Sequence, residues 1–124
     1  MADTAVPRFD SVCIDCPDPA ELARFYGALL DWPVPEGGGD SEYVSLDPPG
    51  GGTAALTFQR APGFAAPTWP DPAVQQQMHL DLAVADLEAA HQRAVALGAR
   101  HLDTQGTFRV YSDPVGHLFC LCSS

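Results

Sequence analysis

The sequence predicts an α+β protein made of two tandem β-α-β-β-β modules. A strand-like segment followed by an Asp-capped helix occurs twice in the 124 residues. The two copies align without a gap, so that Ser11 corresponds to His79 and Asp18 corresponds to Asp86. Each copy then continues into a D-P-x-G turn between two β-prone runs, which is a signal for a hairpin. We therefore expect the two copies to form a single domain over residues 1–124.

The first module is expected at about 8–60. Apolar and polar residues alternate from Ser11 to Asp18, which predicts a strand. Asp18 and Glu21 form a capping box, and apolar residues at helical spacing extend the following helix to about Leu30. The other strands of this module are expected near Trp32–Val34, at 43–46 and at 53–59.

The second module, expected at about 76–124, repeats this pattern. The alternation that begins at His79 ends at Asp86, which is predicted to cap a helix, and Gly98 is expected to terminate that helix. The Pro-rich segment at about 61–75 has no periodicity and is expected to link the modules. The remaining strands are expected near Arg100–Leu102, at 108–111 and at 118–122.

The charge of the chain excludes several classes of partner. Sixteen acidic residues against six basic ones, all Arg, give a net charge of −10. A phosphate backbone or an anionic membrane requires a positive surface, so we expect neither a nucleic acid nor a membrane as partner. The sequence has no apolar stretch of spanning length and does not begin like a signal peptide. We therefore expect a cytoplasmic protein in which the four cysteines stay reduced.

The repeat and its turns resemble the vicinal oxygen chelate superfamily, which includes glyoxalase I, ring-cleaving dioxygenases and bleomycin resistance proteins. Four runs are similar to its glyoxalase-like branch: Cys13–Ala20, Pro67–Pro72, His79–Leu82 and Asp113–Cys120. The resemblance implies that the two sheets pair into a cup-shaped mixed sheet, the glyoxalase/bleomycin resistance fold, with the site inside the cup. It also implies a homodimer.

The resemblance further implies four metal positions on strands. They correspond to Ser11, to Ala55 or its neighbour, to His79 and to Cys120. Of these, His79 is a typical ligand, whereas an alanine and a cysteine stand where the superfamily has glutamates. We therefore predict a degenerate metal site and no resident cofactor, with binding of a divalent metal as the open alternative.

Strand alternation predicts which side chains share the interior of the cup. His79, Asp15 and Asp81 are the candidate catalytic residues, because an imidazole and carboxylates suit proton transfer. Alternatively, the histidine is only hydrogen-bonded to a neighbour and the carboxylates reach solvent at strand ends. The expected ligand-binding residues are Ser11, Cys13, Thr57, Gln59, Trp69, Tyr111 and Cys120.

Some of these side chains have competing interpretations. Trp69 on the linking loop either covers the mouth of the cup or shields a sheet edge or a dimer neighbour. Arg109 and Tyr111 are interpreted as facing opposite ways, so only one of them can orient a ligand. His117, at the second turn, is expected to face solvent, and His91 to lie on a helix surface. No function is predicted for these two histidines.

The cysteines also allow two interpretations. A soft-metal site formed by Cys13, Cys120 and His79 is one of them. Simple burial of small thiols is the other, and we favour it because free cysteines are commonly buried.

Three functions are compatible with these observations. The leading hypothesis is a glyoxalase-like protein that binds a small molecule and acts, if it is an enzyme, on a small polar metabolite. The second is non-catalytic sequestration of a cationic antibiotic or toxin, which suits the negative charge of the chain. The third is a lyase or dioxygenase that depends on a divalent metal.

Overall fold

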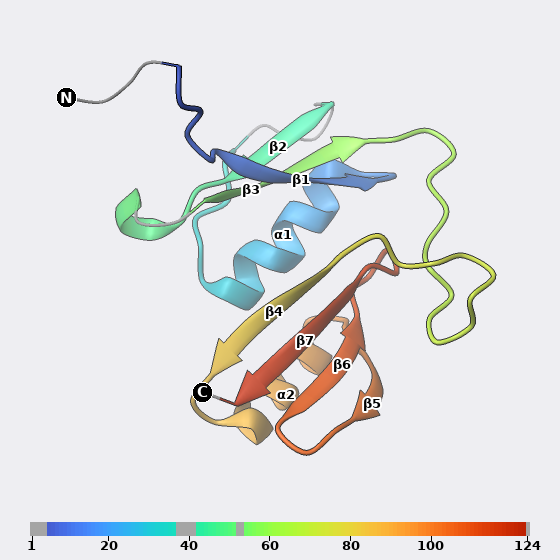
Figure 1. The fold of residues 1–124 in the computed structure, drawn as a ribbon. Helices are drawn as coiled ribbons and strands as arrows, with labels where there is room; N and C mark the ends of the chain where they lie inside the picture. Colours follow the sequence, from blue (N-terminus) through green and yellow to red (C-terminus); the bar gives the residue numbers. More distant parts are fainter. Residues whose placement is uncertain (1–4, 37–41, 52–53, 124) are drawn as a thin grey trace.

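The computed structural model describes residues 5–36, 42–51 and 54–123 (Figure 1). The α+β class is confirmed, and these described residues form two sheets and two helices. Neither helix is long and apolar enough to cross a membrane. In chain order the elements are β1 (Ser11–Cys16), α1 (Pro19–Leu30), β2 (Tyr43–Leu46), a 3₁₀ turn (Pro49–Gly51), β3 (Ala55–Arg60), β4 (His79–Val84), α2 (Leu87–Ala96), β5 (Arg100–Thr104), β6 (Phe108–Ser112) and β7 (Leu118–Ser123).

Each module forms its own sheet. The first sheet has the order β1-β3-β2 and the second has the order β4-β7-β6-β5. In both, the first strand of the module runs parallel to the last one, with Ser11 opposite Ala55 and His79 opposite Leu118. The same parallel pairing in both sheets is the structural counterpart of the sequence repeat.

The strand expected near Trp32–Val34 is absent, so the described residues of the first module form one strand fewer than those of the second. Pro33 and Pro35 flank Val34, and each removes a backbone N–H that a sheet would require. The segment instead runs as irregular chain, and Trp32 packs against the core. The expected strand at 53–59 begins at Ala55, and Thr53 lies outside the described residues.

The capping residues predicted from the sequence start both helices, and the predicted Gly98 follows the end of α2. Asp18 Oδ1 accepts a hydrogen bond from the Glu21 N–H at 3.3 Å, and Asp86 Oδ1 accepts one from the Ala89 N–H at 3.0 Å. Gly98 follows α2 with a φ of 113°, a conformation that favours glycine. These local signals therefore place α1 and α2 directly after β1 and β4.

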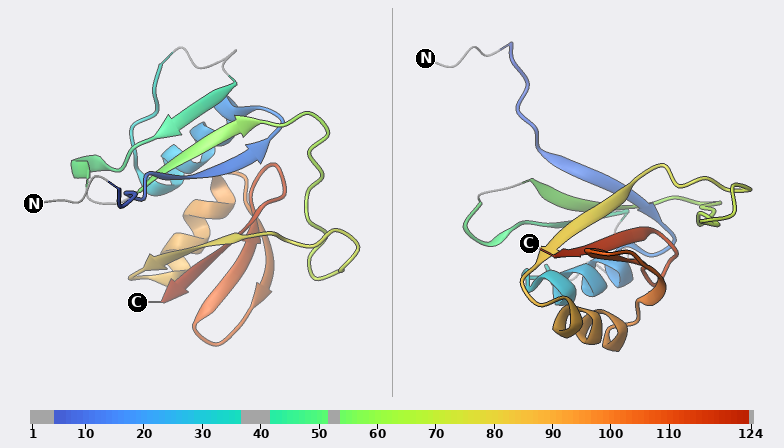
Figure 2. Two further views of the ribbon diagram at one scale, coloured as in Figure 1. Left: turned by 45° about the horizontal axis from the view of Figure 1, so that its top comes forward. Right: turned by 60° about the horizontal axis from the view of Figure 1, so that its bottom comes forward.

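Both helices cover the same side of the two sheets, which leaves the other side open (Figure 2). Ile14 and Cys16 of β1 point towards the helices and are buried, whereas Cys13 and Asp15 alternate with them and are exposed. The helix side therefore carries the hydrophobic core. The open side is free to carry polar side chains.

The two modules share one core at their junction. Tyr26 of α1 stacks on Phe58 of its own module, with ring centroids 5.7 Å apart. The same ring meets Phe119 of the second module edge-on at 6.2 Å. Arg93 of α2 donates hydrogen bonds to the carbonyl oxygens of Ala28 and Leu29 at the end of α1. Aromatic packing and a helix-end contact thus join the halves.

A buried carboxylate lies at the same junction. Asp113, with 3% exposure, accepts a hydrogen bond from the Tyr26 hydroxyl at Oδ2, at 2.7 Å. Its Oδ1 accepts the backbone N–H groups of Val115, Gly116 and His117 at 2.9–3.0 Å. Burial raises the pKa of Asp113, and burial together with this carboxylate raises the pKa of Tyr26. The Asp residue of the second D-P-x-G turn therefore attaches that turn to α1.

Replacing Tyr26 by Phe tests this attachment. The change removes the hydroxyl that donates to a buried carboxylate oxygen, which should lower the free energy of unfolding by about 1–3 kcal/mol. Urea denaturation followed by circular dichroism measures it. Tyr43→Phe is the matched control, because Tyr43 is 59% exposed and should tolerate the change. Equal stability of the two variants would contradict the role given to the Tyr26–Asp113 bond.

Candidate functional site

The open face of the first sheet carries a row of polar side chains, as strand alternation predicted. The Ser45 hydroxyl lies 2.9 Å from that of Thr57, which donates a hydrogen bond to Ser11 Oγ at 3.3 Å. One step further along the sheet, Cys13 Sγ donates to Gln59 Oε1 at 3.3 Å. The predicted residues of this sheet therefore do share one face. Their role in binding stays a prediction.

The open face of the second sheet brings His79, Asp81 and Cys120 together. His79 Nε2 lies 3.3 Å from Asp81 Oδ1, and the candidate ligand atoms of the three residues lie within 4.8 Å of one another. Cys122 Sγ lies 4.0 Å from the same carboxylate oxygen. Burial raises the pKa of the Cys120 thiol to about 11, and the neighbouring Asp81 carboxylate adds to the shift. Cys120 is therefore a neutral thiol near pH 7.

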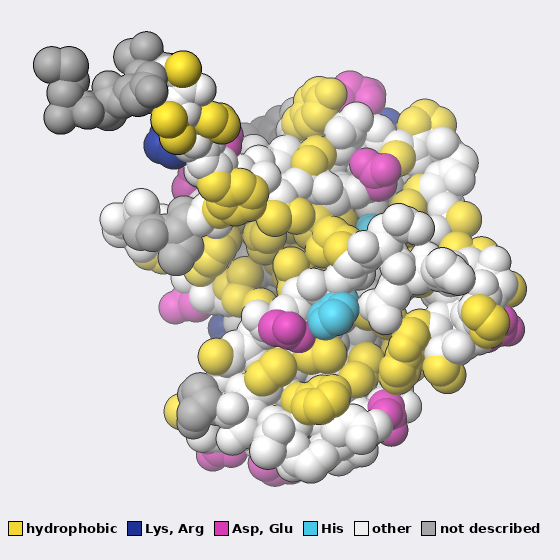
Figure 3. All heavy atoms as spheres, in the orientation of Figure 1, with side chains coloured by type: hydrophobic (Ala, Val, Ile, Leu, Met, Phe, Trp, Pro, Cys, Tyr) yellow, Lys and Arg dark blue, Asp and Glu magenta, His cyan; other side chains and the backbone are white. Residues whose placement is uncertain are grey.

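The predicted site is thus divided between the sheets. Among the described residues, the group that could hold a metal is His79, Asp81 and Cys120. The soft-metal alternative named Cys13 together with Cys120 and His79, and Cys13 is not part of the group. Asp81 takes its place, and Cys13 instead bonds Gln59 on the first sheet. In Figure 3 hydrophobic side chains fill the hollow between the sheets, and acidic side chains are scattered around it.

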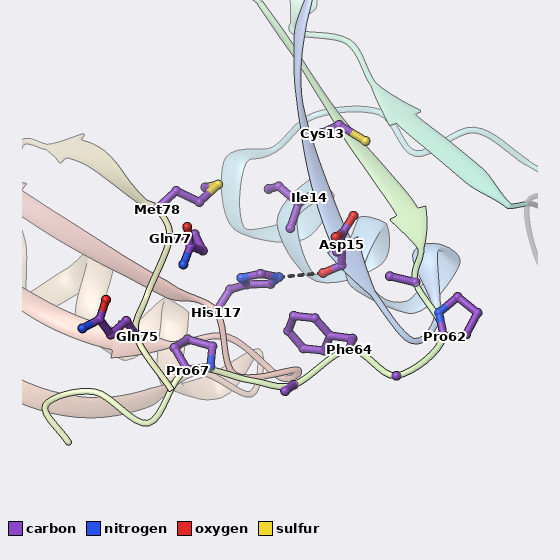
Figure 4. A pocket seen from close by; sticks show the side chains of 13 residues that line it. Cys13, Ile14, Asp15, Pro62, Phe64, Pro67, Gln75, Gln77, Met78 and His117 are labelled. Carbon is purple, nitrogen blue, oxygen red and sulfur yellow. Dashed lines mark hydrogen bonds between the residues drawn. The ribbon is translucent and has the colours of Figure 1, made fainter. Parts of the chain in front are cut away.

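A cavity of about 440 Å³, here called the junction pocket, lies where β1, the linking loop and the second turn meet (Figure 4). Cys13 and Asp15 of the predicted site line it. The sequence did not identify its other walls. These come from the linking loop with Phe64, from the segment before β4 with Gln75, Gln77 and Met78, and from His117.

The expectation that His117 faces solvent is wrong, because its ring contacts the first module. Its Nε2 donates a hydrogen bond to the backbone oxygen of Asp15 at 2.6 Å, and its ring centroid lies 4.8 Å from that of Phe64 (Figure 4). The reason lies in the preceding turn, because Asp113 holds the N–H groups of the turn and directs the chain at His117 towards the first module. The only sequence signal was its place directly after D-P-x-G.

Tyr111 corrects a second expectation. It lies two residues from Arg109 in β6, so both side chains share a face, and that face is the helix side. Tyr111 is fully buried and its hydroxyl lies 2.8 Å from His91 Nδ1 of α2. Arg109 pairs with Glu88 of the same helix at 3.0 Å. Neither residue lies on the open face, and His91 is a packing partner rather than only a surface residue.

Trp69 lies on the linking loop, as expected, but outside the wall of the junction pocket. It lines a separate hollow of about 280 Å³ together with Gln76. The Gln76 side-chain oxygen is buried and has no hydrogen-bond partner among the described residues. Ser11 and Thr57 line a third hollow, of about 300 Å³, with Arg8 and Asp10.

This arrangement defines a class of protein: two β-α modules with their helices on one side and a polar open side. The chain belongs to the glyoxalase-like domain family, whose sequence profile matches residues 11–122. The resemblance to the vicinal oxygen chelate superfamily is thereby confirmed, together with the glyoxalase/bleomycin resistance fold. No curated protein matches the chain.

Solved structures support the fold at low sequence identity. A glyoxalase/bleomycin resistance protein/dioxygenase family enzyme from Burkholderia phytofirmans PsJN has a TM-score of 0.72 at 15% identity, covering 92% of this chain and 96% of that one. A glyoxalase-related enzyme from Fulvimarina pelagi has a TM-score of 0.67 at 20% identity, covering 96% and 89%. A glyoxalase/bleomycin resistance protein from Albidiferax ferrireducens T118 has a TM-score of 0.64 at 17% identity, covering 94% and 98%. These similarities establish the fold alone.

The cysteines should differ sharply in reactivity. Burial raises the pKa of both Cys16 and Cys120 to about 11, so at pH 8 roughly one thiol in a thousand is ionised. Cys13 is exposed on the open face. We expect iodoacetamide to modify Cys13 first and to reach the two buried thiols only on unfolding, as measured by peptide mass spectrometry. Cys13→Ser should abolish the fast phase, and modification of Cys120 at the rate of Cys13 would contradict the burial argument.

Proposed function

We propose that this chain binds a small organic molecule in the junction pocket and over the adjoining open face. The observation that carries the proposal is the cavity itself, because about 440 Å³ lies within the range of small-molecule sites. Its walls come from both modules and from the linking loop, and polar groups converge on an otherwise apolar lining. Such a mixture binds the body of a ligand by contact and orients it by hydrogen bonds.

Acid–base catalysis on a small polar metabolite is a second candidate, favoured by the His79–Asp81 pair. The carboxylate lies 3.3 Å from His79 Nε2, close enough to orient the imidazole. His79 then exchanges a proton with the ligand through its other ring nitrogen. Asp15, at the edge of the junction pocket, is a further candidate base.

Non-catalytic sequestration of a cationic antibiotic or toxin is the alternative from another class. The net charge of −10 favours the approach of a cation. Two variants separate it from catalysis. Loss of turnover with retained binding in His79→Ala supports an enzyme. Weakened binding in Asp81→Asn without any turnover supports sequestration.

The four-residue metal site that the superfamily implies does not fit this chain. Ala55 offers no ligand atom. Ser11 Oγ accepts a hydrogen bond from Thr57, and both residues belong to the first sheet, whereas His79 belongs to the second. The three remaining donors, His79, Asp81 and Cys120, are spread over 4.8 Å and include a thiol whose pKa is about 11. A metal would first have to displace that proton. This donor set supports a degenerate site.

A metal titration tests this part of the proposal. Protein purified without chelator should contain no stoichiometric metal, and Zn²⁺, Ni²⁺, Mn²⁺ or Fe²⁺ should not raise its melting temperature. Cys120→Ser should behave like the parent protein. One tightly held equivalent per chain, lost in Cys120→Ser, would instead assign a metal-dependent lyase or dioxygenase activity.

Binding itself is tested by a thermal-shift screen of small metabolites followed by calorimetry. We expect some compounds to raise the melting temperature in proportion to ligand concentration. Phe64→Ala should weaken their binding, whereas Trp69→Ala should not, because Trp69 lines the separate hollow. Ligands whose affinity is unchanged by Phe64→Ala would contradict the assignment of the binding site to the junction pocket.

We further propose that the protein acts as a cytoplasmic homodimer. β1 and β4 are edge strands of their respective sheets, and uncovered edges are commonly protected by association. Light scattering in solution tests the stoichiometry.

A further inference from the structure

The charge distribution of the junction pocket points to one class of ligand. Asp15 supplies the only carboxylate among the described residues that line it, and no arginine lines it. The chain contains no lysine at all. An anionic ligand would therefore meet one exposed carboxylate and no fixed positive side chain that could balance its charge.

Apolar side chains line the same pocket as this carboxylate. Phe64 and Met78 stand on opposite sides of His117, and Pro62 and Pro67 extend the wall along the linking loop (Figure 4). The Phe64 ring is partly buried against the His117 ring, with centroids 4.8 Å apart. A pocket that holds both an aromatic ring and a carboxylate suits an ammonium group, because both attract positive charge.

The remaining polar groups of the wall are amides. Gln75 and Gln77 both line the pocket, on the segment that leads into β4. Their carbonyl oxygens can accept N–H groups from a ligand, in addition to the Asp15 carboxylate. A ligand with several N–H donors at one end and an apolar body at the other would use both parts of the wall.

We propose that the junction pocket binds a small organic cation, an ammonium group carried on an apolar or aromatic body. The ammonium group contacts the Asp15 carboxylate, and the apolar body packs against Phe64 and Met78. This inference rests on the proposed function and adds the charge of the ligand to it. Asp81 belongs to the other polar group, outside the wall of this pocket, and takes no part in the contact.

The competing interpretation makes Asp15 an ordinary solvated carboxylate at the end of a strand. It is exposed, so its attraction for a cation is limited to that of a surface ion pair. Such a pair changes affinity by roughly fivefold at low ionic strength and is weakened by salt. If the side chain is merely solvated, the charge of the ligand makes no difference.

Three compounds of similar size separate these cases. Benzylammonium, benzyl alcohol and phenylacetate carry a positive, neutral and negative group on the same aromatic body. Isothermal titration calorimetry at pH 7 and low ionic strength should give an affinity for benzylammonium about fivefold higher than for the alcohol, and weaker binding still for phenylacetate. Added salt should reduce the preference.

Asp15→Asn provides the decisive variant, because the side chain is exposed and the backbone oxygen that binds His117 remains. This variant should bind benzylammonium and benzyl alcohol with equal affinity, and its affinity for the alcohol should be the same as that of the parent protein. Asp31→Asn is the matched control: Asp31 is exposed at the end of α1 and lies in the left-handed conformation that asparagine also adopts, so the change removes the same charge from the chain and should preserve the preference. Loss of the preference in both variants would assign it to the overall charge and overturn the role of Asp15.

Two further outcomes separate this inference from the function on which it rests. Equal binding of all three compounds, weakened by Phe64→Ala but not by Asp15→Asn, would overturn the cation inference and leave the pocket as a small-molecule site. Absence of binding by all three, together with no ligand from the metabolite screen, would overturn both.

Discussion

The buried Asp113 carboxylate is the constraint on which the junction of the two modules depends. A carboxylate removed from water requires hydrogen bonds to both oxygens. Here one oxygen accepts three backbone N–H groups of its own turn, and the other accepts the Tyr26 hydroxyl from α1 of the first module. The turn and the helix are therefore fixed together. His117, which follows the turn, then reaches the backbone of β1 and completes the wall of the junction pocket.

The placement of both helices on one side of the sheets explains why the other side is chemically varied. The core is built from the helix-facing residues, so the open-face positions are released from packing. The chain uses them for a hydroxyl row on the first sheet and for the His79–Asp81–Cys120 group on the second. The positions that the superfamily resemblance implies for a metal fall across both groups, and one of them, Ala55, offers no side-chain ligand atom. The junction pocket, which draws on both modules, is the feature that unites them.

Local signals in the sequence predicted the repeat, both helix starts and the shared face of Ser11, Cys13 and Asp15, because caps and alternation act over a few residues. The prediction of a strand at Trp32–Val34 was wrong because Pro33 and Pro35 remove backbone N–H groups that a sheet requires, and this outweighs the β propensity of the segment. His117 could not be recognised, since its partner is a backbone oxygen 102 residues away. The sequence interpretation placed Tyr111 and Arg109 on opposite faces of β6. It was wrong because residues two apart in a strand share a face.

The central claim is that the ligand site lies at the junction of the modules rather than on the second sheet alone. Backbone amide NMR during titration with benzylammonium tests it most directly. The account predicts that the largest shift changes fall on residues 61–67, 75–78 and 115–117, around the walls of the junction pocket. Changes confined to residues 79–83 and 118–122, around the His79–Asp81–Cys120 group, would contradict it.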